Sequence, residues 1–137
     1  MRLRPHPRPA PIRGGIDFCC MNLYEFEGKR LFEKYGIATP RGVDIHRGDT
    51  DGRDAALQHL YNELGHTNVV VKAQILSGKR GKNNGIKFCS TPDDVVLDVN
   101  EMFISIVRNQ YVAAVRVEEK LNIAEEHYLS IIYDTNT

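Results

Sequence analysis

The sequence predicts one α+β domain with layers of the α/β kind, in which helices flank a mixed sheet. The first observation is that 137 residues, 42% of them hydrophobic, are enough for one core of ordinary size. The second is the order of the apolar patterns, which gives helix, strand, helix, strand, strand, helix, strand, strand. The third is the absence of any internal repeat.

The first helix is expected over residues 23–35, with Asn22 as its cap. Gly36 follows in the position where a glycine commonly ends a helix. Residues 39–42 contain proline and glycine and predict a turn, and residues 43–45 predict a short strand.

The second helix is expected to begin at Asp51 or Asp54 and to stop at Gly65. Its apolar residues recur at helical spacing and predict a buried face formed by Ala55, Ala56, Leu57, Leu60 and Leu64. Residues 68–76 then form an apolar, β-branched run, which is typical of a central strand.

A strand over residues 85–89 is followed by Thr91 and Pro92, which together predict a third helix. Two acidic residues follow at the positive end of that helix. Its expected buried face is Val95, Val96, Val99, Phe103 and Ile106. Residues 111–118 and 128–133 alternate between apolar and polar and predict two strands joined by an acidic link.

Residues 1–20 differ from the rest of the chain, and we expect the domain to occupy residues 21–137. Up to Gly15 they hold four arginines, four prolines and no acid, a composition that prevents a continuous helix. They are expected to be a disordered extension or the result of a start codon assigned too early. A ligand for an SH3-type domain is the alternative.

The three cysteines and the hydropathy predict a cytoplasmic protein. Cys19, Cys20 and Cys89 form no Cys-x-x-Cys pair, and reduced thiols are the simplest interpretation. No apolar run reaches the roughly 20 residues that span a membrane. No cluster of metal ligands and no nucleophile beside a base is found, so neither a metal site nor a catalytic residue is predicted.

The segment that follows the central strand predicts an anion site. Lys72 lies on the strand, and Lys79, Arg80 and Gly81 lie in a short basic loop rich in glycine. Glycines let backbone N–H groups turn toward a ligand, and the cations suit a polyphosphate. The loop fits neither Gly-x-x-x-x-Gly-Lys-Ser/Thr nor Gly-x-Gly-x-x-Gly, and a solvated hairpin tip is the alternative.

The charges are unevenly distributed along a chain whose net charge is zero. Residues 64–92 hold five basic residues and no acidic one, whereas residues 93–137 hold nine acidic and three basic residues. A zero net charge argues against a general nucleic-acid binder, so a nucleotide is favoured, with a nucleic-acid-binding domain as a third hypothesis.

Three segments resemble the β subunit of succinyl-CoA synthetase (succinate–CoA ligase). They are residues 21–37, MNLYEFEGKRLFEKYGI, then VKAQ at 71–74 with the RGK loop, then VE at 117–118 followed by IAEEHYL at 123–129. They occur in the order of that family and together are specific.

The resemblance implies the first part of an ATP-grasp fold and a cytoplasmic ligase of the tricarboxylic acid cycle. That enzyme joins succinate to coenzyme A at the expense of ATP or GTP, with an α subunit whose histidine carries the phosphoryl group. Neither a membrane nor a nucleic acid is an expected partner.

The resemblance also assigns nucleotide-binding roles by position. Lys72 would contact phosphates, and Lys79, Arg80 and Gly81 would cover them. Here Lys79 replaces a glycine of the commoner family pattern. Glu118 would accept a bond near the adenine and ribose, Glu126 would be a second acceptor, and a backbone group at Leu121 would contact the base.

The same resemblance leads us to expect that the chain is a fragment. Family members continue with residues that bind Mg²⁺ and with a domain that meets the α subunit. A chain without them would be inactive alone, and the alternative is a free-standing nucleotide-binding or subunit-interaction module. ATP cannot be told from GTP, nor succinate from malate or citrate.

Overall fold

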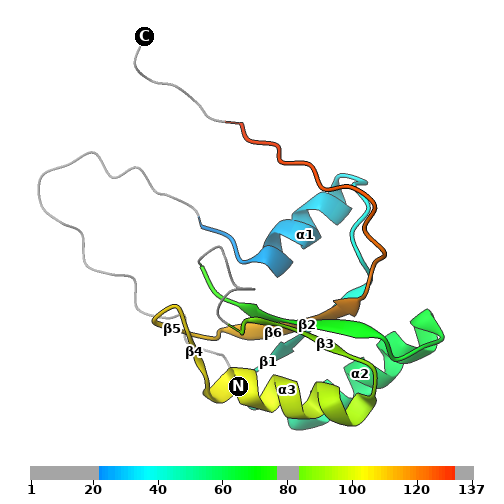
Figure 1. Ribbon diagram of the computed structural model, residues 1–137, viewed down its shortest axis with the longest axis vertical. Coiled ribbons are helices and arrows are strands. Elements are labelled where there is room, and N and C mark those ends of the chain that lie inside the picture. Colours follow the sequence, from blue (N-terminus) through cyan, green and yellow to red (C-terminus); the bar gives the residue numbers. More distant parts are fainter. Residues whose placement is uncertain (1–21, 77–83, 132–137) are drawn as a thin grey trace, which may run out of the picture.

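The computed structural model describes residues 22–76 and 84–131, which form a four-stranded sheet with helices on both faces (Figure 1). The predicted α+β class is therefore confirmed. The helices are α1 (Glu25–Lys34), α2 (Thr50–Leu64) and α3 (Pro92–Ile104). The sheet strands are β1 (Gly42–His46), β2 (Val69–Gln74), β3 (Ile86–Cys89) and β6 (Ala114–Glu119). A separate hairpin joins β4 (Ile106–Val107) and β5 (Gln110–Tyr111).

The order of the strands is β1-β6-β2-β3, and every neighbouring pair is antiparallel. The expectation of a mixed sheet is therefore wrong. The reason is that β6 inserts between β1 and β2, so two strands that run parallel are never neighbours. The expectation that the strand over 68–76 is central is confirmed, because β2 lies between β6 and β3.

The apolar core lies on the sheet face that α2 and α3 cover (Figure 1). Successive side chains of a strand point to opposite faces, so alternate positions of β2 and β6 supply the sheet side of this core. The helices contribute Leu57, Leu60, Val95, Val99 and Met102, all nearly inaccessible to solvent. Burial of such side chains is the main favourable term for the fold.

The predicted end of α1 and the predicted cap of α3 are confirmed, whereas the predicted start of α1 is wrong. Gly36 has a left-handed φ of 75° and follows α1, as predicted. Asn22 does not cap α1, which begins two residues after Leu23, with Glu27 accepting a hydrogen bond from the Tyr24 N–H at 2.9 Å. Thr91 caps α3 as predicted, because its hydroxyl accepts from the Asp94 N–H at 3.2 Å.

The second helix begins earlier than expected. Asp49, rather than Asp51 or Asp54, is its cap, and its carboxylate accepts from the Gly52 N–H at 2.9 Å. Ala55 is exposed, contrary to the expected buried face, and Tyr61 is buried in its place.

The third helix is shorter than expected. Ile106 was expected on its buried face but is exposed, because α3 ends at Ile104.

The prediction of a strand over residues 128–133 is wrong for its described part, residues 128–131. These residues form no ladder, and Tyr128 is 92% exposed. Alternation alone cannot make a strand, because its backbone must find a partner. The predicted strand over 111–118 begins only at Ala114, since Tyr111 belongs to the hairpin.

Some predictions concern residues outside the described ranges, namely the extension over 1–20 and the basic loop with Lys79, Arg80 and Gly81. None of the helices in the described parts combines the length and the apolar character that crossing a bilayer requires.

Candidate functional site

The sheet face under α1 is charged, unlike the apolar face opposite. Val71, Ala73, Val115 and Val117 point into the core, so the residues between them point toward α1. On this side lie Lys72 from β2 and Arg116 and Glu118 from β6. The alternation of valine with charged residues in β6 therefore places buried charges on one face.

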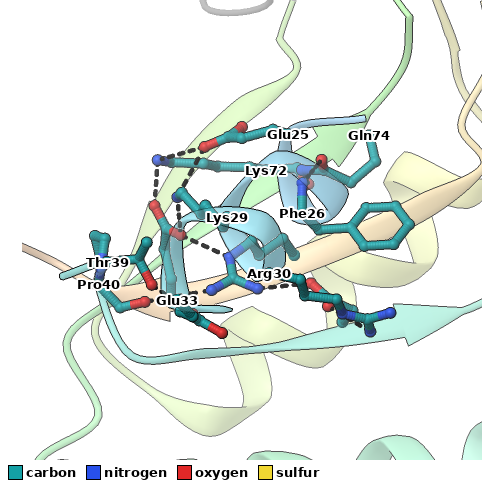
Figure 2. Close-up of polar contacts among 12 residues, drawn as sticks. Glu25, Phe26, Lys29, Arg30, Glu33, Thr39, Pro40, Lys72 and Gln74 are labelled. Atoms are coloured by element: carbon teal, nitrogen blue, oxygen red, sulfur yellow. Dashed lines mark hydrogen bonds and ion pairs between the residues drawn. The ribbon is translucent and has the colours of Figure 1, made fainter. Parts of the chain in front are cut away.

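Glu118 is the centre of this arrangement, with a side chain only 2% exposed. One of its oxygens, Oε1, accepts a hydrogen bond from the Lys72 ammonium. The other, Oε2, accepts from the Lys29 ammonium of α1 and, at 2.8 Å, from the Arg116 Nε. Glu25 makes ion pairs with both lysines, because its Oε1 lies 2.9 Å from Lys29 Nζ and 3.5 Å from Lys72 Nζ (Figure 2).

Arg116 links Glu118 to the next strand. Its guanidinium donates to Asp44 Oδ1 of β1 at 2.8 Å and to the carbonyl of Pro40 at 3.3 Å. Asp44 in turn binds Arg30 of α1 at 2.9 Å, and Arg30 also lies over the Phe26 ring. Each buried charge therefore has an opposite partner, as burial requires.

The pKa of Glu118 follows from two opposing effects. Burial raises the pKa of this carboxyl, but the hydrogen bonds from Lys29, Lys72 and Arg116 outweigh it and hold the pKa below its ordinary value of 4.5. For Arg116, burial lowers the pKa and the bonds to Glu118 and Asp44 raise it, with a net increase. Both groups are therefore charged near neutral pH.

A buried amide fixes α1 over this network. Gln74 accepts a hydrogen bond from the Phe26 N–H at 3.2 Å and donates to the Lys72 carbonyl at 3.1 Å (Figure 2). The Phe26 ring is buried and meets the Tyr24 and His46 rings. The start of α1 is therefore attached to β2 close to Lys72.

A cleft of about 380 Å³ opens beside the charged network, between the sheet and the chain that follows β6. Lys29, Lys72 and Glu118 of the network form one end of the cleft. Its remaining lining is mostly apolar or acidic: Pro40, Val70, Ile86, Phe88, Glu119, Lys120, Leu121, Ile123 and Glu126. Such a mixture of apolar walls and a few convergent charges is typical of a small-molecule site.

Four of the seven residues predicted from the sequence meet in this cleft: Lys72, Glu118, Leu121 and Glu126. The other three, Lys79, Arg80 and Gly81, lie outside the described residues. Other lining residues were not predicted from the sequence, namely Lys29 and the apolar residues Val70, Ile86, Phe88 and Ile123. The alternation in β3 could have indicated Phe88, which is 68% exposed on a strand and lies under the Lys120 ammonium.

The cleft suits binding better than metal or nucleophilic chemistry. The described residues contain no group of three or more His, Cys, Asp or Glu side chains that could hold a metal ion. Glu118 already neutralises three cations, so it does not fit a metal-ligand role.

Cys89 is buried in the apolar core on the opposite face of the sheet. Burial and its hydrogen bond to Asp98 raise the pKa of the thiol to about 12. Such a thiol is a poor nucleophile.

Comparison with known proteins gives one family and a consistent set of relatives. A family model described as an ATP-grasp domain matches residues 22–137. The chain is 37% identical over 124 residues to the "Succinate--CoA ligase [ADP-forming] subunit beta" of Chlorobium limicola, which covers 85% of this chain and 31% of that protein. The chain is also 39% identical over 114 residues to the protein of the same name in Methanocaldococcus jannaschii, and 33% identical over 117 residues to that in Bacteroides fragilis.

These matches leave most of each relative without a counterpart. The alignments cover 83% and 85% of this chain but only 29% of the Methanocaldococcus and Bacteroides proteins. The chain therefore spans about a third or less of the length of the curated relatives that it matches.

Proposed function

From the premise that this chain belongs to the ATP-grasp domain family, we propose that its cleft binds the nucleotide of an acid–CoA ligase. The chain would be the N-terminal, nucleotide-binding part of a succinate–CoA ligase β subunit. The observation that carries the proposal is that Lys72 lines the same cleft as Glu118, Leu121 and Glu126, although it lies 46 residues before Glu118 in the sequence.

The phosphates would lie at the Lys72 end of the cleft. The Lys72 ammonium is held by a central strand and is about one-fifth exposed, so it faces the cleft at little entropic cost. A positive charge fixed in advance stabilises the negative charge of a polyphosphate. Lys79, Arg80 and Gly81 would cover the same phosphates, as predicted from the sequence.

The nucleoside would lie between apolar walls. Val70, Ile86, Leu121 and Ile123 would contact the faces of the base, and Phe88 offers a ring on which a base can stack. Glu118 and Glu126 would accept hydrogen bonds from the ribose hydroxyls or from an amino group of the base. Among the described residues of the cleft, none favours ATP over GTP by its charge or shape.

The complete reaction would need more than this chain. We propose that succinate, coenzyme A and ATP or GTP react in a hetero-oligomer with an α subunit, giving succinyl-CoA, ADP or GDP and phosphate. Mg²⁺ would neutralise phosphate charge there, but no group of His, Cys, Asp or Glu among the described residues fits as its ligands.

Titration calorimetry of the full chain with ATP tests the proposal. The unmodified chain should bind ATP, and Lys72→Ala should weaken binding by about tenfold or more, which corresponds to roughly 1.4 kcal/mol. Lys87→Ala is the matched control, because Lys87 lies on the neighbouring strand and pairs with Asp98 and Glu101 away from the cleft. Equal affinities of the unmodified chain and the Lys72 variant would reject the role of Lys72.

A further inference from the structure

We infer that Lys29 is a positioning residue of this cleft, which holds Glu118 in place while the Lys72 ammonium moves from Glu118 to a phosphate. The inference rests on the proposed function, because it needs a nucleotide in the cleft. It assigns a role to a helix residue for which the sequence motifs predict none.

The two carboxylate oxygens of Glu118 have different cationic partners. Oε1 receives the Lys72 ammonium, whereas Oε2 receives both the Lys29 ammonium and the Arg116 Nε. Lys72 comes from β2, whereas Lys29 comes from α1, and both side chains line the cleft (Figure 2). One oxygen therefore depends on a single lysine, and the other has two cations of its own.

A polyphosphate in the cleft would compete with Glu118 for the Lys72 ammonium. A lysine ammonium has three donors on a flexible stem, so it can turn from one anion to another. Its partners are Glu118 Oε1 and, at 3.5 Å, Glu25 Oε1. A phosphate in the cleft carries more negative charge than one carboxylate, and would draw the ammonium toward it.

Movement of Lys72 would free one oxygen of Glu118. Once Lys72 has moved, Oε1 becomes an acceptor that lines the cleft and can bind a hydroxyl or amino group of the nucleoside. A buried carboxylate without cations would be strongly destabilised. Lys29 and Arg116 would prevent this destabilisation, because both remain paired with Glu118 Oε2.

Lys29 rather than Arg116 is the informative residue to change. Arg116 also binds Asp44 and Pro40, so its loss would disturb the contact between β1 and β6 directly. Lys29 pairs with Glu118 and with Glu25 of its own helix. Its neighbour Arg30 is a matched control, because it lies on the same helix and makes an ion pair with Asp44 rather than with Glu118.

The experiment measures ATP and adenosine binding to the full chain by titration calorimetry. Lys29→Met should weaken ATP binding by about tenfold, and Lys29→Arg should restore it to within about threefold. Adenosine has no phosphate to draw Lys72 away, so Lys29→Met should change its affinity by less than about twofold. Arg30→Met should leave both affinities within about twofold. If Lys29→Met does not fold, Lys29→Gln carries the same expectations.

A double-mutant cycle with Glu118→Gln separates positioning from direct contact. If Lys29 acts through Glu118, Lys29→Met should weaken ATP binding by less than about twofold once Glu118 is glutamine. A full loss in that background would mean that Lys29 contacts the phosphate itself, and would overturn the inference. An unchanged ATP affinity of Lys29→Met, or an equal loss for adenosine, would also overturn it.

The controls keep this inference apart from the proposed function. If the unmodified chain binds ATP and Lys29→Met binds equally well, only the inference fails. If the unmodified chain binds neither ATP nor adenosine, the proposed function fails and the inference fails with it.

Discussion

Gly42 of β1 lies directly opposite Glu118 of β6 in the antiparallel ladder. A Cβ atom at Gly42 would lie 2.7 Å from the Glu118 Cβ and 2.7 Å from the Val117 carbonyl oxygen. No side chain fits there unless β1 moves away from β6. The glycine therefore allows the close strand contact that holds Glu118 at the edge of the cleft.

Gly42→Ala should thus damage both stability and the site. Overpacking of this kind costs about 1–3 kcal/mol, measurable by urea denaturation. ATP affinity should fall as well, because β6 and Glu118 shift. Gly28→Ala is the control, since a Cβ there meets nothing within 4 Å and alanine is favoured in a helix. Equal stability of Gly42→Ala and the unmodified chain would contradict the close contact.

Acid should reduce the contribution of Glu118 to stability. Its pKa is lowered on folding, so the stabilisation is present above the ordinary value of 4.5 and is lost as pH falls through the lower, folded pKa. Glu118→Gln should therefore be less stable than the unmodified chain at pH 7 by roughly 3–5 kcal/mol, the usual result of breaking a buried pair. The free energies of unfolding of the two chains should converge below pH 4.5. A constant difference between pH 7 and acid would show that Glu118 is not the titrating group.

The Cys89 thiol should resist alkylation in the folded chain. It is buried and its pKa is raised to about 12, so little thiolate exists at pH 8. Iodoacetamide followed by peptide mapping should label Cys89 only after denaturant is added. Rapid labelling of the peptide that contains Cys89 without denaturant would contradict its burial.

Removal of the cap of α3 should cost stability without touching the cleft. Thr91→Ala removes the hydroxyl that accepts from the Asp94 N–H, a loss of about 1 kcal/mol that thermal denaturation can measure. ATP affinity should be unchanged, because Thr91 is not among the residues that line the cleft. A loss of affinity equal to that of Lys72→Ala would argue against the location of the site.

Local chemistry explains which parts of the fold were predictable. Thr91 and Pro92 mark the start of α3, and Gly36 marks the end of α1, because caps and left-handed glycines act within a few residues. Asn22 has the right chemistry for a cap, but α1 begins later, and Glu27 accepts a hydrogen bond from the N–H of Tyr24, the residue that caps the helix. Such competition between two local solutions is not visible in spacing.

The site was predictable only in part, because its geometry depends on long-range pairing. The motif resemblance selected Lys72 and Glu118, and the structure brings both to one cleft. Their contact depends on the β2–β6 register, in which Val70 faces Glu118. No local pattern shows that β6 inserts beside β2. Lys29 was missed for the same reason, since its partner is 89 residues away.

We propose that the cleft beside Lys72 and Glu118 binds nucleotide. The most direct test is a two-dimensional ¹⁵N–¹H NMR titration of the full chain with ATP. We expect the largest shifts at the backbone amides of Val70, Lys72, Leu121 and Ile123, with little change at Leu57 and Val99 in the opposite core. Shifts confined to residues outside the cleft, or no shifts at millimolar ATP, would contradict the claim.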